Sequence, residues 1–173
     1  RLDERPSHRP TGVSMRPVLE AGPRLRSLQI DYDDEVEYRG TQKLYGLARA
    51  ADTDPPYFLT VSFTHPHPPF VAPQRHWDLY RDEDVAPPRV PPIAFDELDE
   101  HSRWLYVAHA QDLYSVSPAQ VQRARRAYYG MVSYVDEKIG RVLEVLREIG
   151  LADNTVVVFA GDHGEMLGEC GMW

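Results

Sequence analysis

Two short, almost continuous runs of apolar residues stand out in the pattern along the chain. The first covers residues 57–63 and the second covers residues 155–159, and both are rich in β-branched and aromatic side chains. Runs of this length without alternating polar positions are typical of central strands in a parallel sheet, which are covered on both faces. The pattern therefore predicts two buried strands, Tyr57–Phe63 and Thr155–Phe159.

A period of three to four residues predicts a first helix over residues 31–51, with one apolar face. Its first turn contains four acids: Asp31, Asp33, Asp34 and Glu35. Negative charge at a helix N-terminus interacts favourably with the helix dipole. We prefer this explanation of the acids to a metal-binding role.

The strongest helix signals lie in residues 117–150. Ser117 is placed as the N-cap, Pro118 as the first helical residue, Gln120 as the partner of the cap, and Gly150 as the C-terminal cap. An apolar stripe on this helix is expected to face the core. It consists of Tyr128, Met131, Val132, Val135, Ile139, Val142, Leu143 and Leu146.

Prolines and charges punctuate the rest of the chain. Residues 1–23 are predicted to be a loop or an arm, residues 71–92 a surface excursion with one helical turn, and residues 94–114 to contain a further helix. The order of strand, helices and strand predicts an α/β fold with right-handed crossovers.

Composition narrows the classes of partner. The 173 residues are 42% hydrophobic, enough for the core of one domain. Acids outnumber bases 27 to 19 and the net charge is −8, which argues against nucleic acid as a partner. No apolar run reaches the roughly 20 residues of a membrane helix, so we expect no membrane partner. The single cysteine, Cys170, cannot form an internal disulfide; this favours a cytoplasmic location only weakly, and the compartment stays unknown.

Polar clusters follow both predicted strands. His65 and His67 alternate with prolines after the first strand, and Asp162 and His163 lie between two glycines after the second. Ligands of α/β folds bind at the carboxyl ends of the strands, so the clusters are candidates for one shared site. A carboxylate and an imidazole together can ligate a cation, although two ligands cannot hold it alone.

Simpler interpretations of these side chains stay open. Asp162 can cap the following helix, and each histidine can be an ordinary hydrogen-bonded loop residue. In the functional interpretation, His67 is a hydrogen-bond donor or acid toward a substrate oxygen.

Several segments together resemble one family, the formylglycine-dependent type I sulfatases of the alkaline-phosphatase superfamily, and within it the choline sulfatases. The matching segments are GPRLRSLQIDYDDEV from Gly22, FTHPHPPFVAP from Phe63, WDLY from Trp77, HSRWL from His101, RAYYGMVSYVDEKIGRVL from Arg126 and TVVVFAGDHGEMLGE from Thr155. The resemblance implies an α/β sandwich with a mainly parallel central sheet, of which this chain holds only a part.

The resemblance also implies roles for individual residues. Asp162 and His163 would be metal ligands for a divalent cation, commonly Ca²⁺, with Mg²⁺ or Mn²⁺ as alternatives. His67 would be catalytic, contacting the sulfate group and protonating the leaving alkoxide, and His65 is a further candidate for substrate binding. The expected substrate is a small-molecule sulfate ester, such as choline sulfate, cleaved to choline and sulfate.

The family's nucleophile is a cysteine, converted to formylglycine, within C-x-P-S-R or C-x-A-x-R. Cys170 is followed by Gly-Met-Trp and does not fit that pattern. We therefore expect residues 1–173 to be a partial sulfatase catalytic domain, without the N-terminal part that carries the nucleophile and without the C-terminal part. Alone, it should be inactive and should aggregate, because its apolar faces would be uncovered.

Three alternatives remain for the complete protein. It can be a sulfatase, a phosphonate monoester hydrolase or phosphodiesterase of the same superfamily, or a noncatalytic module that retains the fold. An oligomeric state is compatible with each of them.

Overall fold

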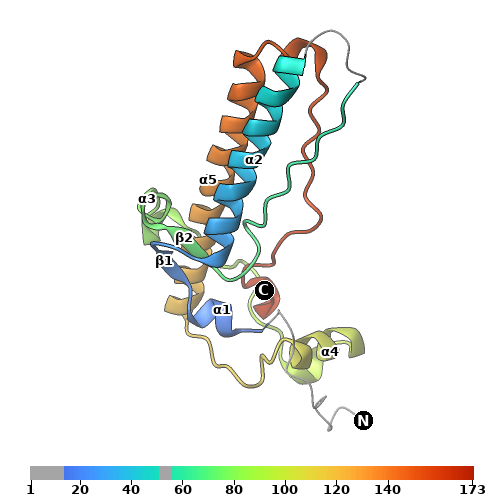
Figure 1. Ribbon diagram of the computed structural model, residues 1–173. Helices are drawn as coiled ribbons and strands as arrows, with labels where there is room; N and C mark the ends of the chain where they lie inside the picture. The colour runs from blue at the N-terminus through green and yellow to red at the C-terminus, as the bar shows by residue number, and fades with distance from the viewer. Residues whose placement is uncertain (1–13, 51–55) are drawn as a thin grey trace.

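A computed structural model describes residues 14–50 and 56–173 of the chain (Figure 1). The described elements are α1 (Arg16–Leu19), β1 (Gly22–Arg24), α2 (Leu28–Ala50), β2 (Val71–Pro73), α3 (Gln74–Trp77), α4 (Glu100–Ala108) and α5 (Pro118–Glu148). Short 3₁₀ turns lie at Asp82–Asp84, Phe95–Glu97, Ala152–Asn154 and Glu169–Gly171. The predictions for residues 1–13 and for residue 51 lie outside the described residues.

The two long helices α2 and α5 lie side by side and form one flank of the molecule (Figure 1). The Ser117 side chain accepts a hydrogen bond from the Gln120 backbone, and the Gln120 side chain accepts one from the Ser117 backbone, which is the predicted cap of α5. Gly150 follows the helix with a positive φ of 75°. In α2, Ser27 caps the first turn by accepting from the Ile30 amide. Both helix predictions are confirmed, and α4 confirms the third.

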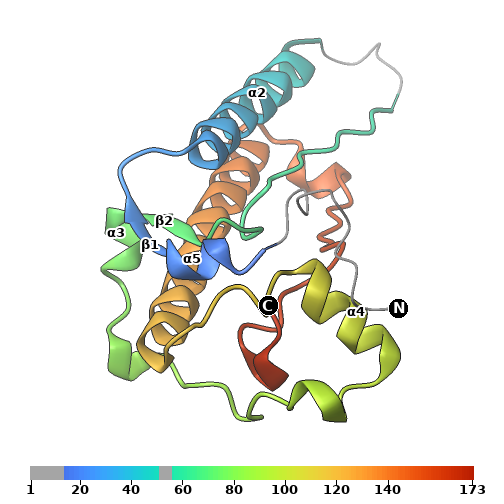
Figure 2. The same ribbon diagram turned by 90° about the horizontal axis from the view of Figure 1, so that it is seen from below.

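The core lies where the N-terminal part of α5 meets α3 and the small parallel sheet of β1 and β2 (Figure 2). A Cβ added at Gly130 of α5 would lie 3.0 Å from the Ala72 Cβ and 3.2 Å from the His76 backbone, so the missing side chain permits this close approach. The core cluster comprises Met15, Val18, Ala21, Phe70, Ala72, Trp77, Ala124, Ala127 and Met131.

The predicted apolar stripe of α5 is only partly the buried face. Met131 and Leu146 are buried, but Val132 is 42% exposed. The buried line along the helix instead passes through Ala124, Ala127, Met131, Tyr134 and Lys138. Small and polar residues thus occupy positions that an apolar pattern alone does not identify.

The β1–β2 sheet was not predicted. Gly22 pairs with Val71 in parallel register, and Val71 and Ala72 are buried. Within residues 14–23, the expected loop or arm contains α1 and the start of β1, so that prediction is wrong there. The helical turn expected in residues 71–92 is confirmed by α3. The first residues of that range, however, belong to the core and not to a surface excursion.

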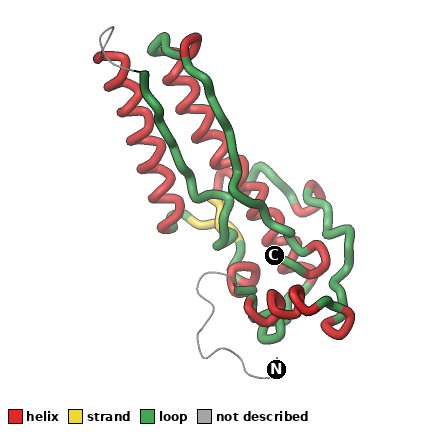
Figure 3. Tube along the Cα trace, turned by 90° about the vertical axis from the view of Figure 1, so that its right-hand side faces the viewer, coloured by secondary structure: helices red, strands yellow, loops and turns green. Residues whose placement is uncertain are grey.

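The two predicted buried strands are extended, but they belong to no sheet of the described chain and are largely exposed. Figure 3 shows both segments running beside the long helices without regular structure of their own. The exposed fractions are 95% at Phe58, 82% at Val158 and 80% at Phe159. The prediction of burial is therefore wrong for these residues. A strand satisfies its backbone hydrogen bonds only through a neighbouring strand, and the described chain supplies none here.

The chain nevertheless runs in the same direction through the two extended segments. At their starts, the Tyr57 hydroxyl is 2.7 Å from Thr155 Oγ1. Beyond their ends, the rings of His67 and His163 are 5.8 Å apart. The first segment also packs on α2, where a Cβ at Gly40 would lie 3.4 Å from both Val61 methyl groups. No helix in the described residues has the length and apolar character that crossing a membrane requires.

Candidate active site

The loop after the first extended segment is fastened to α2 by a buried carboxylate. Asp33 Oδ1 accepts hydrogen bonds from the Thr64 amide at 2.8 Å and the Thr64 hydroxyl at 3.1 Å. Asp33 Oδ2 accepts from the His65 amide at 3.0 Å and lies 2.5 Å from His65 Nδ1. Burial raises the pKa of the Asp33 carboxyl, but the bonds from His65 and Thr64 outweigh burial and hold that pKa below its ordinary value. Asp33 is therefore an ionised anchor for the loop.

His67 has a defined ring orientation on this loop. Its amide donates to the Thr64 carbonyl, and its Nδ1 lies 2.8 Å from the Pro68 carbonyl oxygen. Because a carbonyl can only accept, Nδ1 must hold the hydrogen of that bond. The other ring nitrogen, Nε2, remains available to exchange a proton with a ligand.

Asp162 and His163 follow the second extended segment. The His163 amide donates to Asp162 Oδ1, and the Asp162 side chain is 94% exposed. His163 Nδ1 lies 3.3 Å from the Gly164 carbonyl, so Nδ1 carries the hydrogen and Nε2 is left for another partner.

One cavity of about 190 Å³ joins residues from both segments. It is lined by Ser14, Pro17, His67, Pro68, Phe70, His163, Glu165 and Trp173. Burial raises the pKa of the Glu165 carboxyl, while the charges of His163 and His67 act in the opposite direction. The structure thus brings His67 and His163 together at one cavity, with a third titratable group beside them.

The pair of Asp162 and His163 fits part of a cation site. Asp162 Oδ2 and His163 Nε2 are 3.9 Å apart. Two atoms bound to one cation take such a separation, because each bond is about 2.0–2.6 Å long. Within residues 14–50 and 56–173, no group of three or more His, Cys, Asp or Glu side chains could hold a metal ion. The described chain therefore offers two adjacent donors, and further ligands would have to come from elsewhere.

His65 lies apart from the cavity lining. Its side chain has no exposed surface, its ring packs against Tyr134 at 4.7 Å, and its Nε2 is buried without a hydrogen-bond partner in the described chain. Of the two loop histidines, His67 is the one that faces the cavity.

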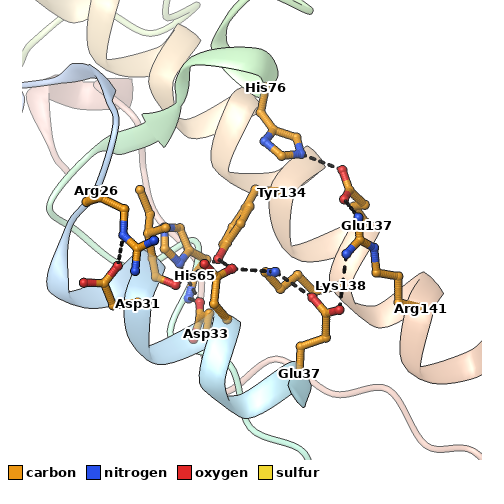
Figure 4. Close-up of polar contacts among 12 residues, drawn as sticks. Arg26, Asp31, Asp33, Glu37, His65, His76, Tyr134, Glu137, Lys138 and Arg141 are labelled. Atoms are coloured by element: carbon orange, nitrogen blue, oxygen red, sulfur yellow. Dashed lines mark hydrogen bonds and ion pairs between the residues drawn. The ribbon is translucent and has the colours of Figure 1, made fainter. Parts of the chain in front are cut away.

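A network of polar side chains lies beside the Asp33–His65 pair (Figure 4). The Tyr134 hydroxyl donates to Asp34 Oδ1 at 2.8 Å, and the buried Lys138 ammonium pairs with Asp34 and Glu37 at 2.6 Å each. Burial and the neighbouring Asp34 raise the pKa of the Tyr134 hydroxyl, which keeps it protonated as a donor. The network joins α2 to α5 beside the Asp33–His65 pair.

Sequence patterns missed the supporting residues. Asp33 and Asp34 were explained by the helix dipole, yet their carboxylates bind His65 and Lys138. Gln29, whose amide nitrogen lies 3.0 Å from the carbonyl oxygens of His67 and Pro68, carried no signal of its own. The four-residue spacing of Gln29 and Asp33 places both on one face of α2, and this spacing is the signal that could have found them.

Comparison with known proteins gives a family match over most of the chain. Residues 17–173 match the family model described as sulfatase. The choline-sulfatase of Rhizobium meliloti is 44% identical over 158 residues, which are 90% of this chain and 31% of that protein. An arylsulfatase of Clostridium perfringens is 36% identical over 70% of the chain and 24% of its own length.

A third relative is named as multifunctional. The multifunctional alkaline phosphatase superfamily protein PehA of Trinickia caryophylli is 31% identical over 66% of the chain and 24% of its own length. The chain thus spans less than a third of the length of each of these three relatives.

Proposed function

The chain belongs to the sulfatase family, and from this premise we propose that the complete protein is a metal-dependent sulfuric ester hydrolase acting on choline sulfate. The observation that carries the proposal is the meeting of His67 and His163 at one cavity, with their rings 5.8 Å apart. The identity of 44% to a choline-sulfatase supports the choice of substrate. We propose further that the 173 residues are one part of the catalytic domain, because they cover 31% of that relative and contain no formylglycine motif.

His67 acts as the general acid in this proposal. In the doubly protonated ring, Nδ1 keeps its hydrogen bonded to the Pro68 carbonyl, and Nε2 carries the transferable proton. When the ester S–O bond breaks, its electron pair stays on the alcohol oxygen, and that oxygen takes the proton from Nε2. The sulfur forms its new bond to the nucleophile, which we expect outside these 173 residues. Acid catalysis by a positioned side chain contributes about 10²–10⁴-fold to a rate.

Asp162 and His163 would hold the divalent cation, and their Oδ2 and Nε2 atoms lie 3.9 Å apart. The family generally uses a divalent cation and a formylglycine, and we propose Ca²⁺ as the ion, with Mg²⁺ or Mn²⁺ as alternatives. Bound there, the cation supplies Lewis-acid neutralisation of negative charge on the sulfate oxygens. The Asp162 carboxylate is suited to this role because its side chain is 94% exposed, and among residues 14–50 and 56–173 its one ion pair is the long contact to His163.

The second candidate is a phosphonate monoester hydrolase or phosphodiesterase of the same superfamily, and the similarity to PehA, which is named as a multifunctional member of the alkaline phosphatase superfamily, keeps it open to test. The complete protein should be assayed on choline sulfate, para-nitrophenyl sulfate, a phosphate diester and a phosphonate monoester. We expect the highest kcat/KM on choline sulfate. A preference for the phosphorus esters would replace the first proposal with the second, and no turnover of any ester would favour a noncatalytic module.

The role of His67 has its own test in the same protein. His67→Asn should lower kcat/KM on choline sulfate by about 10²–10⁴-fold. His101→Asn is the matched control, because His101 is exposed on α4 and far along the chain from the cavity residues. Equal activities of the two variants would contradict the proposal.

A further inference from the structure

We propose that Gln29 and Asp33 of α2 form a clamp of positioning residues that fixes the ring of His67 and its hydrogen on Nδ1. The inference rests on the proposed function for its kinetic consequence, while the geometry of the clamp stands by itself. Together the two side chains make six contacts with the loop of residues 64–68, four from Asp33 and two from Gln29.

Asp33 holds the first half of the loop as an acceptor only. All four of its partners are N–H or O–H groups of Thr64 and His65, and an ionised carboxylate has about four lone-pair positions for them. An asparagine would present an NH₂ group to N–H donors on one side. The position therefore requires the charge as well as the shape of aspartate.

Gln29 holds the second half of the loop as a donor. Its Nε2 lies 3.0 Å from the His67 carbonyl and 3.0 Å from the Pro68 carbonyl, so both amide hydrogens are used. The Pro68 carbonyl is the same group that accepts from His67 Nδ1 at 2.8 Å. Gln29 consequently fixes the acceptor that decides which ring nitrogen of His67 carries the hydrogen.

The clamp residues lie outside the cavity lining. Gln29 and Asp33 are absent from the residues that line the cavity, whereas His67 and Pro68 belong to it. The clamp residues therefore act through His67 and do not touch a ligand themselves. Their spacing of one helical turn means that α2 holds both halves of the loop from one rigid face.

A kinetic test separates positioning of an acid from general stability. Choline sulfate releases an alkoxide that needs a proton, whereas para-nitrophenyl sulfate releases a phenolate that leaves without one. In the complete protein, Gln29→Ala and Gln29→Glu should lower kcat on choline sulfate by about 10–100-fold, the size of effect of misplacing a catalytic group by an ångström. The loss on para-nitrophenyl sulfate should be smaller, and KM should change less than kcat.

Gln42→Ala is the matched control, with the same substitution at an exposed position of the same helix. It should leave both activities unchanged. Equal losses on the two esters in the Gln29 variants, or no loss, would overturn the clamp. If the wild type cleaves sulfate esters and His67→Asn abolishes this, such a result contradicts the clamp alone, whereas an inactive wild type contradicts the proposed function.

A second measurement needs no activity. Nitrogen NMR of isotope-labelled histidine in the complete protein, assigned with His67→Asn, reports which nitrogen of His67 carries the hydrogen. At a pH high enough for the ring to be neutral, we expect the Nδ1–H form in the wild type and a mixture of the two neutral forms in Gln29→Ala. An Nε2–H form in the wild type, or the same spectrum in both proteins, would show that Gln29 does not set the ring.

Discussion

The pair of long helices and the two extended segments beside it differ in how their backbones are satisfied. Within α2 and α5, the interior peptide groups find their partners one turn away in the same element, and the caps at Ser27 and Ser117 serve amides of the first turn. Residues 57–63 and 155–159 form no ladder in the described chain, and several of their apolar side chains are exposed. The helices are complete in themselves, whereas the segments depend on neighbours.

The residues that stabilise the fold and the residues proposed to react therefore lie in different parts of the molecule. The core cluster and the buried ion pairs lie on α5, α2 and the elements packed against them. The proposed acid and metal ligands lie just beyond the extended segments. The helical part should therefore decide whether the protein folds, and the segment ends should decide whether it reacts.

The largest effect is expected at the segment ends. In the complete protein, removal of the cation by a chelator, or the substitution Asp162→Asn, should lower activity by about 10²–10⁴-fold, because Lewis-acid stabilisation is worth several kcal/mol. Melting followed by helical circular dichroism should hardly change in Asp162→Asn. A variant that loses helices together with activity would break the division between the two parts.

In the helical part, Met131→Ala should lower the free energy of unfolding by about 2–5 kcal/mol, because removing this fully buried side chain leaves a cavity in the core. Val132→Ala is its matched control on the same helix, at a position that is 42% exposed. The control should stay within about 0.5 kcal/mol. Denaturant unfolding of the complete protein measures both, and equal values would show that α5 is not packed as described.

A smaller effect depends on pH through His76, which joins α3 to Glu137 of α5 at 2.9 Å. Burial lowers the pKa of the His76 imidazole below its ordinary 6.5, although Glu137 acts in the opposite direction. The unfolded chain therefore takes up a proton at higher pH than the folded chain. The stability contribution is present above pH 6.5 and is lost as the pH falls toward the folded pKa.

Unfolding free energies measured between pH 7 and pH 5 test this sign. Replacing the histidine, as in His76→Gln, should flatten the decline in that range. The exposed His101→Gln offers the corresponding control and should retain the slope of the wild type. A stability that rises on acidification would mean that the ion pair with Glu137 dominates over burial.

The smallest change in free energy is expected for Val158→Thr in the isolated 173-residue chain. Val158 is 82% exposed, so the substitution should alter the free energy of unfolding by no more than about 0.5 kcal/mol. It should, however, reduce concentration-dependent association, which light scattering follows, because the unpaired apolar segment is an edge for other chains. A monomeric isolated chain that melts cooperatively would contradict both the expected association and the partial-domain proposal.

Local signals in the sequence predicted the helices. The cap formed by Ser117 and Gln120 and the glycine at position 150 act within one turn, so no tertiary information was required. The meeting of His67 and His163 followed from the rule that parallel strands end at the same edge of a sheet, and the two rings do lie close together. The burial of residues 155–159 did not follow, because burial of a strand depends on partners that the described chain does not provide.

The other residues around the site could not be predicted, because their partners are far away in the sequence. Asp33 and Asp34 are neighbours among similar acids, and only the fold shows that one meets His65 and the other Lys138. Lys138 itself interrupts an apolar pattern and is buried because two carboxylates surround its ammonium group. Composition and periodicity cannot distinguish such residues from solvated charges.

Because α5 is one uninterrupted helix, its number of residues sets the distance between the core and the segment that leads to the site. Its 31 residues extend over about 46 Å at 1.5 Å for each residue, and Gly130, which receives β2, lies 18 residues before the end of the helix, where the turn toward His163 begins. Inserting one residue would turn everything downstream by about 100° relative to everything upstream. Related sequences should therefore tolerate exchanges of residue type along this helix far better than any change in its number of residues.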